Sequence, residues 1–147
     1  MHKLIIILLL TATPAFASQS QTDSLVAILP QLRGEEKLEA LQTLVALAEK
    51  EPTMGRFATM LLEEAQRQKN IDAQALALIT LVEYYFYQFD TDSVFMAGEQ
   101  ALQFLRKHKL YNKTGYVQHN LILRHSYAGQ RITALRKAEE TPRRAAI

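Results

Sequence analysis

This chain has few side chains that could carry out acid–base or metal chemistry, and their spacing along the sequence does not favour either kind of site. His119 and His125 are separated by about 120° around a helix, so they cannot share a metal as a pair four residues apart can. The adjacent pairs Glu35–Glu36, Glu63–Glu64 and Glu139–Glu140 cannot face each other on a helix, which makes them poor acid–base dyads. We interpret these pairs as solvated helix surface. The sequence contains no phosphate-binding loop, nucleophile elbow or zinc-protease motif, so we predict neither an enzyme nor a bound cofactor or metal.

Two charged segments also have simpler interpretations than ligand binding. The triplet Asp90-Thr91-Asp92 lacks the glycine and the distant glutamate of a calcium loop, and it is typical of a helix cap, with Thr91 or Asp92 as the capping residue. The basic residues 106–109 and 143–144 have no aromatic residues between them, so we interpret them as helix-end and tail charges. The formal net charge is only +2, which does not favour a nucleic-acid partner.

The strongest candidate for partner contact is the aromatic run in "LVEYYFYQFDTDS", residues 81–93. It is either a binding box or the covered inside of a helix. At about 100° per residue, one stripe of this helix is apolar and belongs to the core. That stripe consists of Leu78, Leu81, Val82, Tyr85 and Phe89. Tyr84 is expected to seal a junction between repeats. Phe86 and Tyr87, beside Glu83, are left as the residues able to touch a partner.

The N-terminus has the layout of a secretory signal. A short basic start precedes an apolar run from Leu4 to Leu10, a break at Pro14 and the small residues 15–17. We predict a signal peptide over residues 1–17, cleavage after Ala17, and a periplasmic or secreted chain; an uncleaved anchor is the alternative. No later stretch is apolar enough to span a membrane, so we predict no span in the mature chain. Cysteine is absent, which excludes disulfides, thiolate metal sites and a cysteine-linked lipid anchor.

The remaining sequence predicts an all-α fold of antiparallel helix pairs. Only 5 glycines and 4 prolines interrupt the chain, and apolar residues recur every three or four positions. A short helix is expected from Asp23 or Ser24 to Leu32, ended by Gly34. The next helices are expected over residues 35–50, 52–70, 71–88 and 93–108. A turn is expected near "YNKTG", residues 111–115, followed by a helix to about Ala128 and another from about Ile132 onward. A sharp corner is expected at Gly129–Gln130.

The helix pairs recur with a period close to that of tetratricopeptide (TPR) repeats. Small or apolar residues seven apart mark the second helix of each pair: Ala58 and Ala65, Val94 and Ala101, and Ala134 and Thr141. Successive pairs are offset by 36 and 40 residues, against a tetratricopeptide period of about 34. We therefore predict a linker with a short helix over residues 18–33 and a TPR-like right-handed α-solenoid over residues 34–140. Its repeats would cover about 34–70, 71–109 and 110–140; a non-repeating helical bundle is the alternative.

The order of several segments resembles one family. They are the signal, "TDSLVAILPQLRGEEKLEALQTLVALAEKEP", "ATMLLEEAQRQKN", "FDTDSVFMAGEQALQFLRKHKLY" and "TALRKAEE". Together they resemble the N-terminal periplasmic sensor region of tetratricopeptide-repeat sensor histidine kinases and transcriptional regulators of anaerobic Gram-negative bacteria. The resemblance implies a helical-repeat sensor that binds a peptide or protein on its concave face. The residues that it implies for this face are Ile79, Glu83, Phe86, Tyr87, His119, Leu123 and Tyr127.

The chain departs from the family pattern at Thr141. There "TPRRAAI", residues 141–147, replaces the continuing helix, and no membrane helix or output domain follows. We therefore expect a truncated or frame-shifted member with an aberrant tail. The alternative to a binding module is a remnant with no independent activity, or a structural piece that self-associates through an uncovered face of Leu121, Leu135 and Ala138 in the last repeat.

Overall fold

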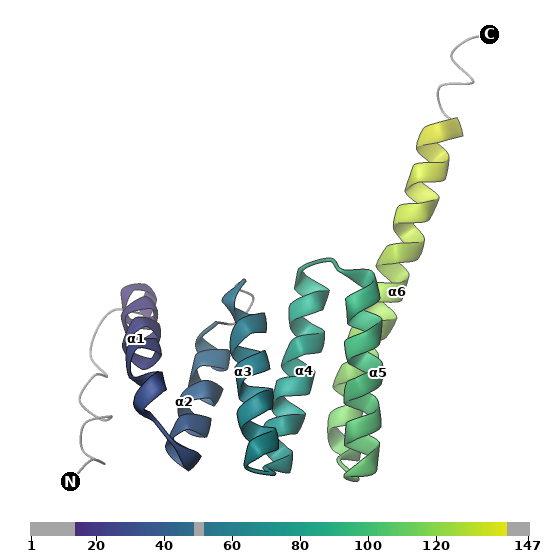
Figure 1. The fold of residues 1–147 in the computed structure, drawn as a ribbon. Coiled ribbons are helices and arrows are strands. Elements are labelled where there is room, and N and C mark those ends of the chain that lie inside the picture. Colours follow the sequence, from purple (N-terminus) through teal and green to yellow (C-terminus); the bar gives the residue numbers. More distant parts are fainter. Residues whose placement is uncertain (1–13, 49–51, 141–147) are drawn as a thin grey trace. The chain divides into compact units, whose positions relative to one another are not determined.

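A computed structural model describes the backbone of residues 14–48 and 52–140, and every regular element in these residues is a helix. The elements are α1 (Pro14–Ile28), the 3-10 helix η2 (Leu29–Gln31), α2 (Gly34–Leu47), α3 (Thr53–Arg67), α4 (Ile71–Tyr87), α5 (Thr91–Lys107) and α6 (Tyr111–Glu140) (Figure 1). The prediction of an all-α protein is confirmed. Within these ranges no helix has the length and apolar character needed to cross a membrane. Most of the predicted signal segment and the whole predicted tail lie outside the described residues.

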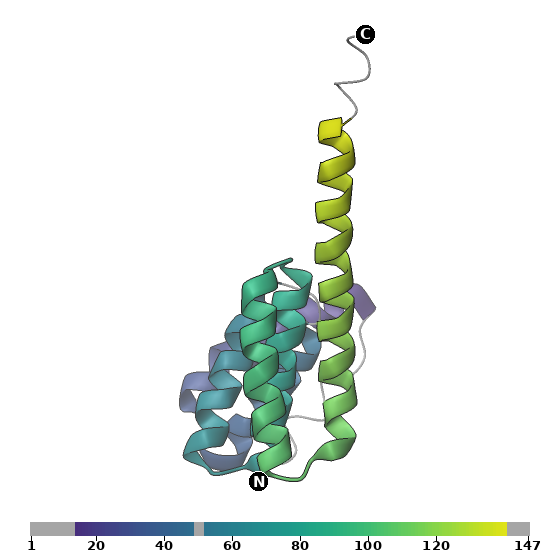
Figure 2. The ribbon, with the colours of Figure 1, turned by 90° about the vertical axis from the view of Figure 1, so that its right-hand side faces the viewer.

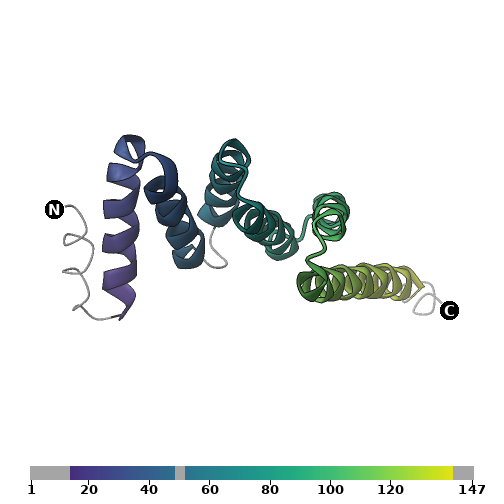
Figure 3. The same ribbon diagram turned by 90° about the horizontal axis from the view of Figure 1, so that it is seen from below.

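The chain divides into two compact units, Met1–Gln74 (unit 1) and Ala75–Ile147 (unit 2), with the boundary inside α4. In unit 1, α1 packs on α2 and α2 packs on α3, so the three helices follow one another side by side (Figure 3). The apolar stripes of α2 and α3 meet in the core of this unit. Its buried side chains include Leu38, Leu41, Leu44, Phe57, Ala58, Leu61 and Ala65.

The first helix begins earlier than the sequence pattern indicates. We expected its cap at Asp23 or Ser24, but α1 begins at Pro14. Proline suits the first turn of a helix, and none of the small and polar residues between Pro14 and Asp23 is a glycine or proline that would stop it. Gly34, expected to end this helix, is instead the first residue of α2 and has a φ of 55°, which favours glycine.

Glu64 corrects the interpretation of the acidic pairs as solvated surface. Its side chain is buried between α2 and α3, where Oε2 lies 3.3 Å from Lys37 Nζ and 3.0 Å from Arg67 Nη2. Gln68 Nε2 donates a hydrogen bond to Glu64 Oε1 at 2.8 Å and another to the Gly34 carbonyl at 2.7 Å. Burial alone would raise the pKa of Glu64, but the hydrogen bond from Gln68 and the two cations outweigh it and lower the pKa. Glu64 therefore joins the two helices as a charged group.

Replacing Glu64 with glutamine is expected to lower the free energy of unfolding at neutral pH by about 1–3 kcal/mol, because Lys37 and Arg67 lose their shared anion. A lowered pKa means that the charged form stabilises the fold above the usual glutamate pKa of 4.5 and that this stabilisation is lost as the pH falls through the lower folded-state value. Denaturant titrations at neutral and acidic pH measure both effects. Glu63→Gln, on the exposed neighbour, is the matched control; equal losses in the two variants would contradict the assignment.

Three turns of the same kind end α3, α4 and α5. In each, one residue has a positive φ: 55° at Lys69, 58° at Phe89 and 59° at Lys109. The next N–H then donates back to the helix, as Asp90 N does to the Tyr85 carbonyl at 3.2 Å. This geometry takes Phe89 off the apolar stripe of α4, and its side chain is 69% exposed. The prediction that Phe89 belongs to the core was therefore wrong.

The residue that caps α5 is Asp90, not Thr91 or Asp92. Its carboxylate accepts a hydrogen bond from Ser93 N at 3.1 Å and one from Ser93 Oγ at 2.6 Å. These bonds lower the pKa of Asp90. The cap lies one residue earlier than expected because the positive φ at Phe89 already ends α4, so that Asp90 takes the extended conformation of an N-cap.

In unit 2, α5 and α6 pack closely at Gly98. A Cβ on this glycine would lie 2.6 Å from Leu121 Cδ2, so any larger residue would force the Leu121 side chain to move. The helix α6 then continues without a break from Tyr111 to Glu140, past the turn between α4 and α5 (Figure 2). The predicted corner at Gly129–Gln130 and the separate sixth helix were wrong, because one glycine costs a helix only about 1 kcal/mol and no proline accompanies it.

Candidate binding face

Three pairs of side chains in unit 2 connect the C-terminal part of α4 and the turn after it to α6. The Tyr116 hydroxyl donates a hydrogen bond to Glu83 Oε1. The rings of Phe86 and Tyr127 have centroids 6.3 Å apart. The guanidinium carbon of Arg124 lies 5.1 Å from the centroid of the Phe89 ring. We call the contact region made by these six residues, in which Arg124 is buried and the others are at least partly exposed, the α4–α6 face.

The polar pair of this face is partly shielded from water. Glu83 is half-buried and Tyr116 keeps 46% of its surface exposed. Desolvation, followed by the hydrogen bond to Glu83, raises the pKa of Tyr116 to about 12. Asn120 is buried one turn along α6 and donates a hydrogen bond to the Tyr116 carbonyl at 3.2 Å. The tyrosine therefore holds its proton at all physiological pH values and acts as a donor.

The raised pKa of Tyr116 predicts a loss of stability at high pH. The folded state keeps this proton between the ordinary tyrosine pKa of 10.0 and about 12, whereas the unfolded chain releases it, so stability falls as the pH rises through this range. Tyr116→Phe is expected to remove this part of the pH dependence. Denaturant unfolding at a series of alkaline pH values measures it. Tyr111→Phe, which removes a more exposed hydroxyl, is the control and should leave the alkaline slope unchanged.

The aromatic run contributes to this face unevenly. All four rings of residues 84–87 are half-buried. The Tyr84 and Tyr85 rings lie 5.2 Å apart and tilted, and the Phe86 and Tyr87 rings lie 5.8 Å apart edge-on. Phe86 also pairs with the ring of Tyr127 on α6. The run therefore forms one side of a helix–helix contact.

The structure brings some of the residues implied by the family resemblance together and leaves others apart. Phe86 and Tyr127 are in contact, and Tyr127 is 46% exposed. Ile79, Tyr87 and Leu123 are half-buried on α4 and α6. Glu83 does not stand free, because it is bound to Tyr116. His119 is exposed and makes no side-chain hydrogen bond or ring contact with the described part of the chain.

Sequence reasoning missed Tyr116, Asn120 and Arg124. Arg124 is the most unusual, because it is only 2% exposed and its Nε and Nη2 atoms have no hydrogen-bond partner among the described residues. The aromatic ring of Phe89 offers the guanidinium a cation–π contact instead. A signal was present in the sequence: Arg124 lies three residues after Leu121 and four before Ala128, which places a charge on an apolar stripe.

The described histidines after α4 lie apart from one another. His125 contacts the Phe95 ring at 6.2 Å between centroids, and His108 follows α5 as its C-cap, 4.4 Å from the Phe104 ring. In the ranges that the structure describes, no group of three or more histidine, aspartate or glutamate residues could hold a metal ion.

Comparison of the whole chain with protein-family models, with curated proteins and with solved structures gave no match.

Proposed function

We propose that this chain is an exported, TPR-like module that binds a peptide or protein on the α4–α6 face. The observation that carries the proposal is the face itself. Donors, acceptors and aromatic rings from two helices converge on one surface, and its outer members Tyr116 and Tyr127 are each 46% exposed. Half-exposed tyrosines supply large, rigid contact area with a polar end, which is typical of protein-recognition surfaces.

The sequence period and the recurring turns support the repeat architecture in this proposal. Helices of 15, 17 and 17 residues, α3, α4 and α5, each end in the same left-handed turn. Stacked helix pairs of this kind commonly bind partners on a concave surface. The resemblance to sensor regions of signalling proteins suggests that the bound partner is a signal. After export and cleavage near Ala17, the chain would meet this signal outside the cytoplasm. Mass spectrometry of the mature N-terminus would test the cleavage.

The binding role is tested by selecting ligands and mapping where they bind. Random peptides displayed on phage would be selected against the chain, and the enriched sequences synthesised. Hydrogen exchange with and without such a peptide is expected to show protection in residues 79–87 and 116–127. Failure to enrich any peptide, or protection confined to unit 1, would contradict the proposal.

A second candidate function is self-association. The observation that favours it is the exposed apolar surface of α6, where Ile122 is 65% and Ile132 is 60% exposed. A second copy of the chain that covered these two side chains would remove their apolar surface from water.

A further inference from the structure

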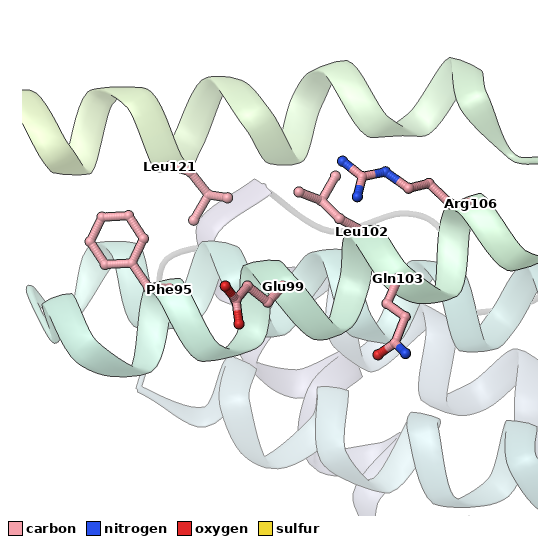
Figure 4. Close-up of a pocket in the computed structure, with 6 residues that line it drawn as sticks. All are labelled: Phe95, Glu99, Leu102, Gln103, Arg106 and Leu121. Carbon is pink, nitrogen blue, oxygen red and sulfur yellow. The ribbon is translucent and has the colours of Figure 1, made fainter.

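The guanidinium group of Arg124 has a buried edge with two hydrogen-bond donors. Leu121 points from α6 toward α5 between Phe95 and Leu102 (Figure 4), and Arg124 follows about one turn later, so it begins on the same packed side of the helix. The residue is 2% exposed, and its Nε and Nη2 atoms have no acceptor among the described residues. The N–H groups of these two atoms point in the same direction and form one edge of the planar, always charged guanidinium.

Two acids in this part of unit 2 already have hydrogen-bond partners. The carboxylate of Asp90 accepts two hydrogen bonds from Ser93. These bonds lower the pKa of Asp90 most, and the nearby charge of Arg124 adds to the lowering. Glu83 accepts the hydrogen bond of the Tyr116 hydroxyl, about two turns before Arg124 on α6. The buried cation is therefore near an acid, but its Nε and Nη2 donors remain without acceptors.

The ring of Phe89 contacts this cation without satisfying its donors. The guanidinium carbon lies 5.1 Å from the ring centroid. An aromatic face attracts a cation, but it accepts hydrogen bonds much more weakly than a carboxylate oxygen does. Phe89 lies in the left-handed turn after α4 and is 69% exposed. Because most of this residue faces solvent, its ring can turn aside and admit an anion without separating α4 from α6.

We propose that the Nε–Nη2 edge of Arg124 binds the side-chain carboxylate of a glutamate in the peptide that occupies the α4–α6 face. The two oxygens of a carboxylate match the two parallel donors, so one group accepts both hydrogen bonds and neutralises the buried charge. A glutamate carries its carboxylate on a narrow stem that can reach donors below the surface. The carboxylate at the end of a peptide is attached directly to the backbone and cannot enter as deeply.

This inference rests on the proposed binding role of the α4–α6 face and specifies the chemistry that the face selects. Arg124 precedes Tyr127 by three residues on α6, a rise of about 4.5 Å along the helix. The guanidinium and the Phe86–Tyr127 ring pair are therefore neighbours. In an extended peptide, a glutamate bound to Arg124 and an aromatic or apolar residue bound to the rings would lie within about three positions of each other.

The carboxylate is tested first with a peptide enriched by phage display and two matched analogues. Changing its glutamate to glutamine should weaken binding to the wild-type chain about 10- to 30-fold, because a neutral amide cannot replace the charge. Amidating the C-terminus should leave the affinity unchanged. A loss on amidation, with none on the change to glutamine, would assign the site to the terminal carboxylate and overturn the proposal.

The arginine is tested with a variant that keeps the apolar stem. Arg124→Met should bind the glutamate and glutamine peptides equally, because the two changes remove the same pair. The variant is expected to fold, since an apolar side chain of similar length commonly replaces a buried charge without loss of structure, and circular dichroism checks this. Arg106 is the matched control: it is an exposed arginine of α5 that lines a groove with Leu121 (Figure 4). Arg106→Met should keep the preference for glutamate, and its loss there would place the carboxylate in that groove and overturn the proposal.

A small probe tests the same site without a selected peptide. The probe is N-acetylglutamate α-methylamide, whose only charge is the side-chain carboxylate, and the glutamine analogue is its control. In nitrogen-15 spectra of the arginine side chains, the Arg124 Nε–H signal is identified by its absence from Arg124→Lys. It should shift with the glutamate probe alone. A shift when phage display enriches no peptide supports the carboxylate site and contradicts the peptide-binding role. No shift with either the probe or a bound peptide overturns the proposal, and a bound peptide then still supports that role.

Discussion

Replacing Gly98 with leucine is expected to separate α6 from α5 and to destabilise unit 2 by about 3 kcal/mol. Even a Cβ at this position would lie 2.6 Å from Leu121 Cδ2 and 3.1 Å from Leu121 Cγ. Leu121 is half-buried and could relieve the contact with a single Cβ by changing rotamer, but we expect the larger leucine side chain to push α6 away from α5 as well. Hydrogen exchange of the α6 amides would report the effect as a loss of protection that is stronger in α6 than in unit 1.

A second glycine in the same unit provides the control for this prediction. Gly115 lies inside α6, and a Cβ there would meet no atom within 4 Å. Gly115→Ala is therefore expected to stabilise the helix by about 0.5–1 kcal/mol, since alanine has the higher helix propensity. Gly98→Ala should gain the same stabilisation from helix propensity, but the steric clash with Leu121 should cancel it. Equal effects of alanine at the two positions would show that α6 does not approach α5 at Gly98.

The helices from α2 to α5 were predictable because local signals agree at their ends. Pro52 precedes α3 as its N-cap, and the turns at Lys69, Phe89 and Lys109 follow helices whose apolar periodicity stops there. Local propensity and tertiary packing point to the same answer at these positions.

The errors fall where two local signals compete. At Gly129 the glycine suggested a turn, but the helix-forming residues on both sides carry α6 through it. At Phe89 the helical spacing suggested burial, but the left-handed turn removed the residue from the stripe. Glu64 was expected to be solvated, but its carboxylate is buried and forms an ion pair with Lys37 on the preceding helix. Sequence spacing within one helix does not reveal such a partner.

In the α4–α6 face, too, the residues whose position depends on one helix were predictable, and those whose contacts depend on the packing of two helices were not. Phe86 was identified from its position beside the apolar stripe of α4, which is a property of one helix. Tyr116 and Arg124 were missed because their roles depend on the register between α6 and α4. That register is set by packing, including the approach of Leu121 to Gly98, and no short-range pattern encodes it.

The contact between the Phe86 and Tyr127 rings leads to a second prediction with a large expected effect, on the affinity for a peptide. Phe86→Ala is expected to weaken the binding of a selected peptide by about 10- to 100-fold, because aromatic side chains at the centre of an interface contribute most of its affinity. Isothermal titration calorimetry with the synthesised peptide measures this loss. Met96→Ala removes a side chain that is 73% exposed on α5, a helix that contributes no residue to this face, and is expected to leave the affinity unchanged.

The partner ring decides whether the face acts as one site. Tyr127→Ala alone is expected to weaken binding by about tenfold. Because the Phe86 and Tyr127 rings touch at 6.3 Å, the double variant should lose less than the two single losses combined, with a coupling energy of about 0.5–1.5 kcal/mol. Strictly additive losses would place the two rings in separate contacts with the peptide. Unchanged affinity in both single variants would remove the α4–α6 face from the binding role altogether, even if the peptide still binds elsewhere on the chain.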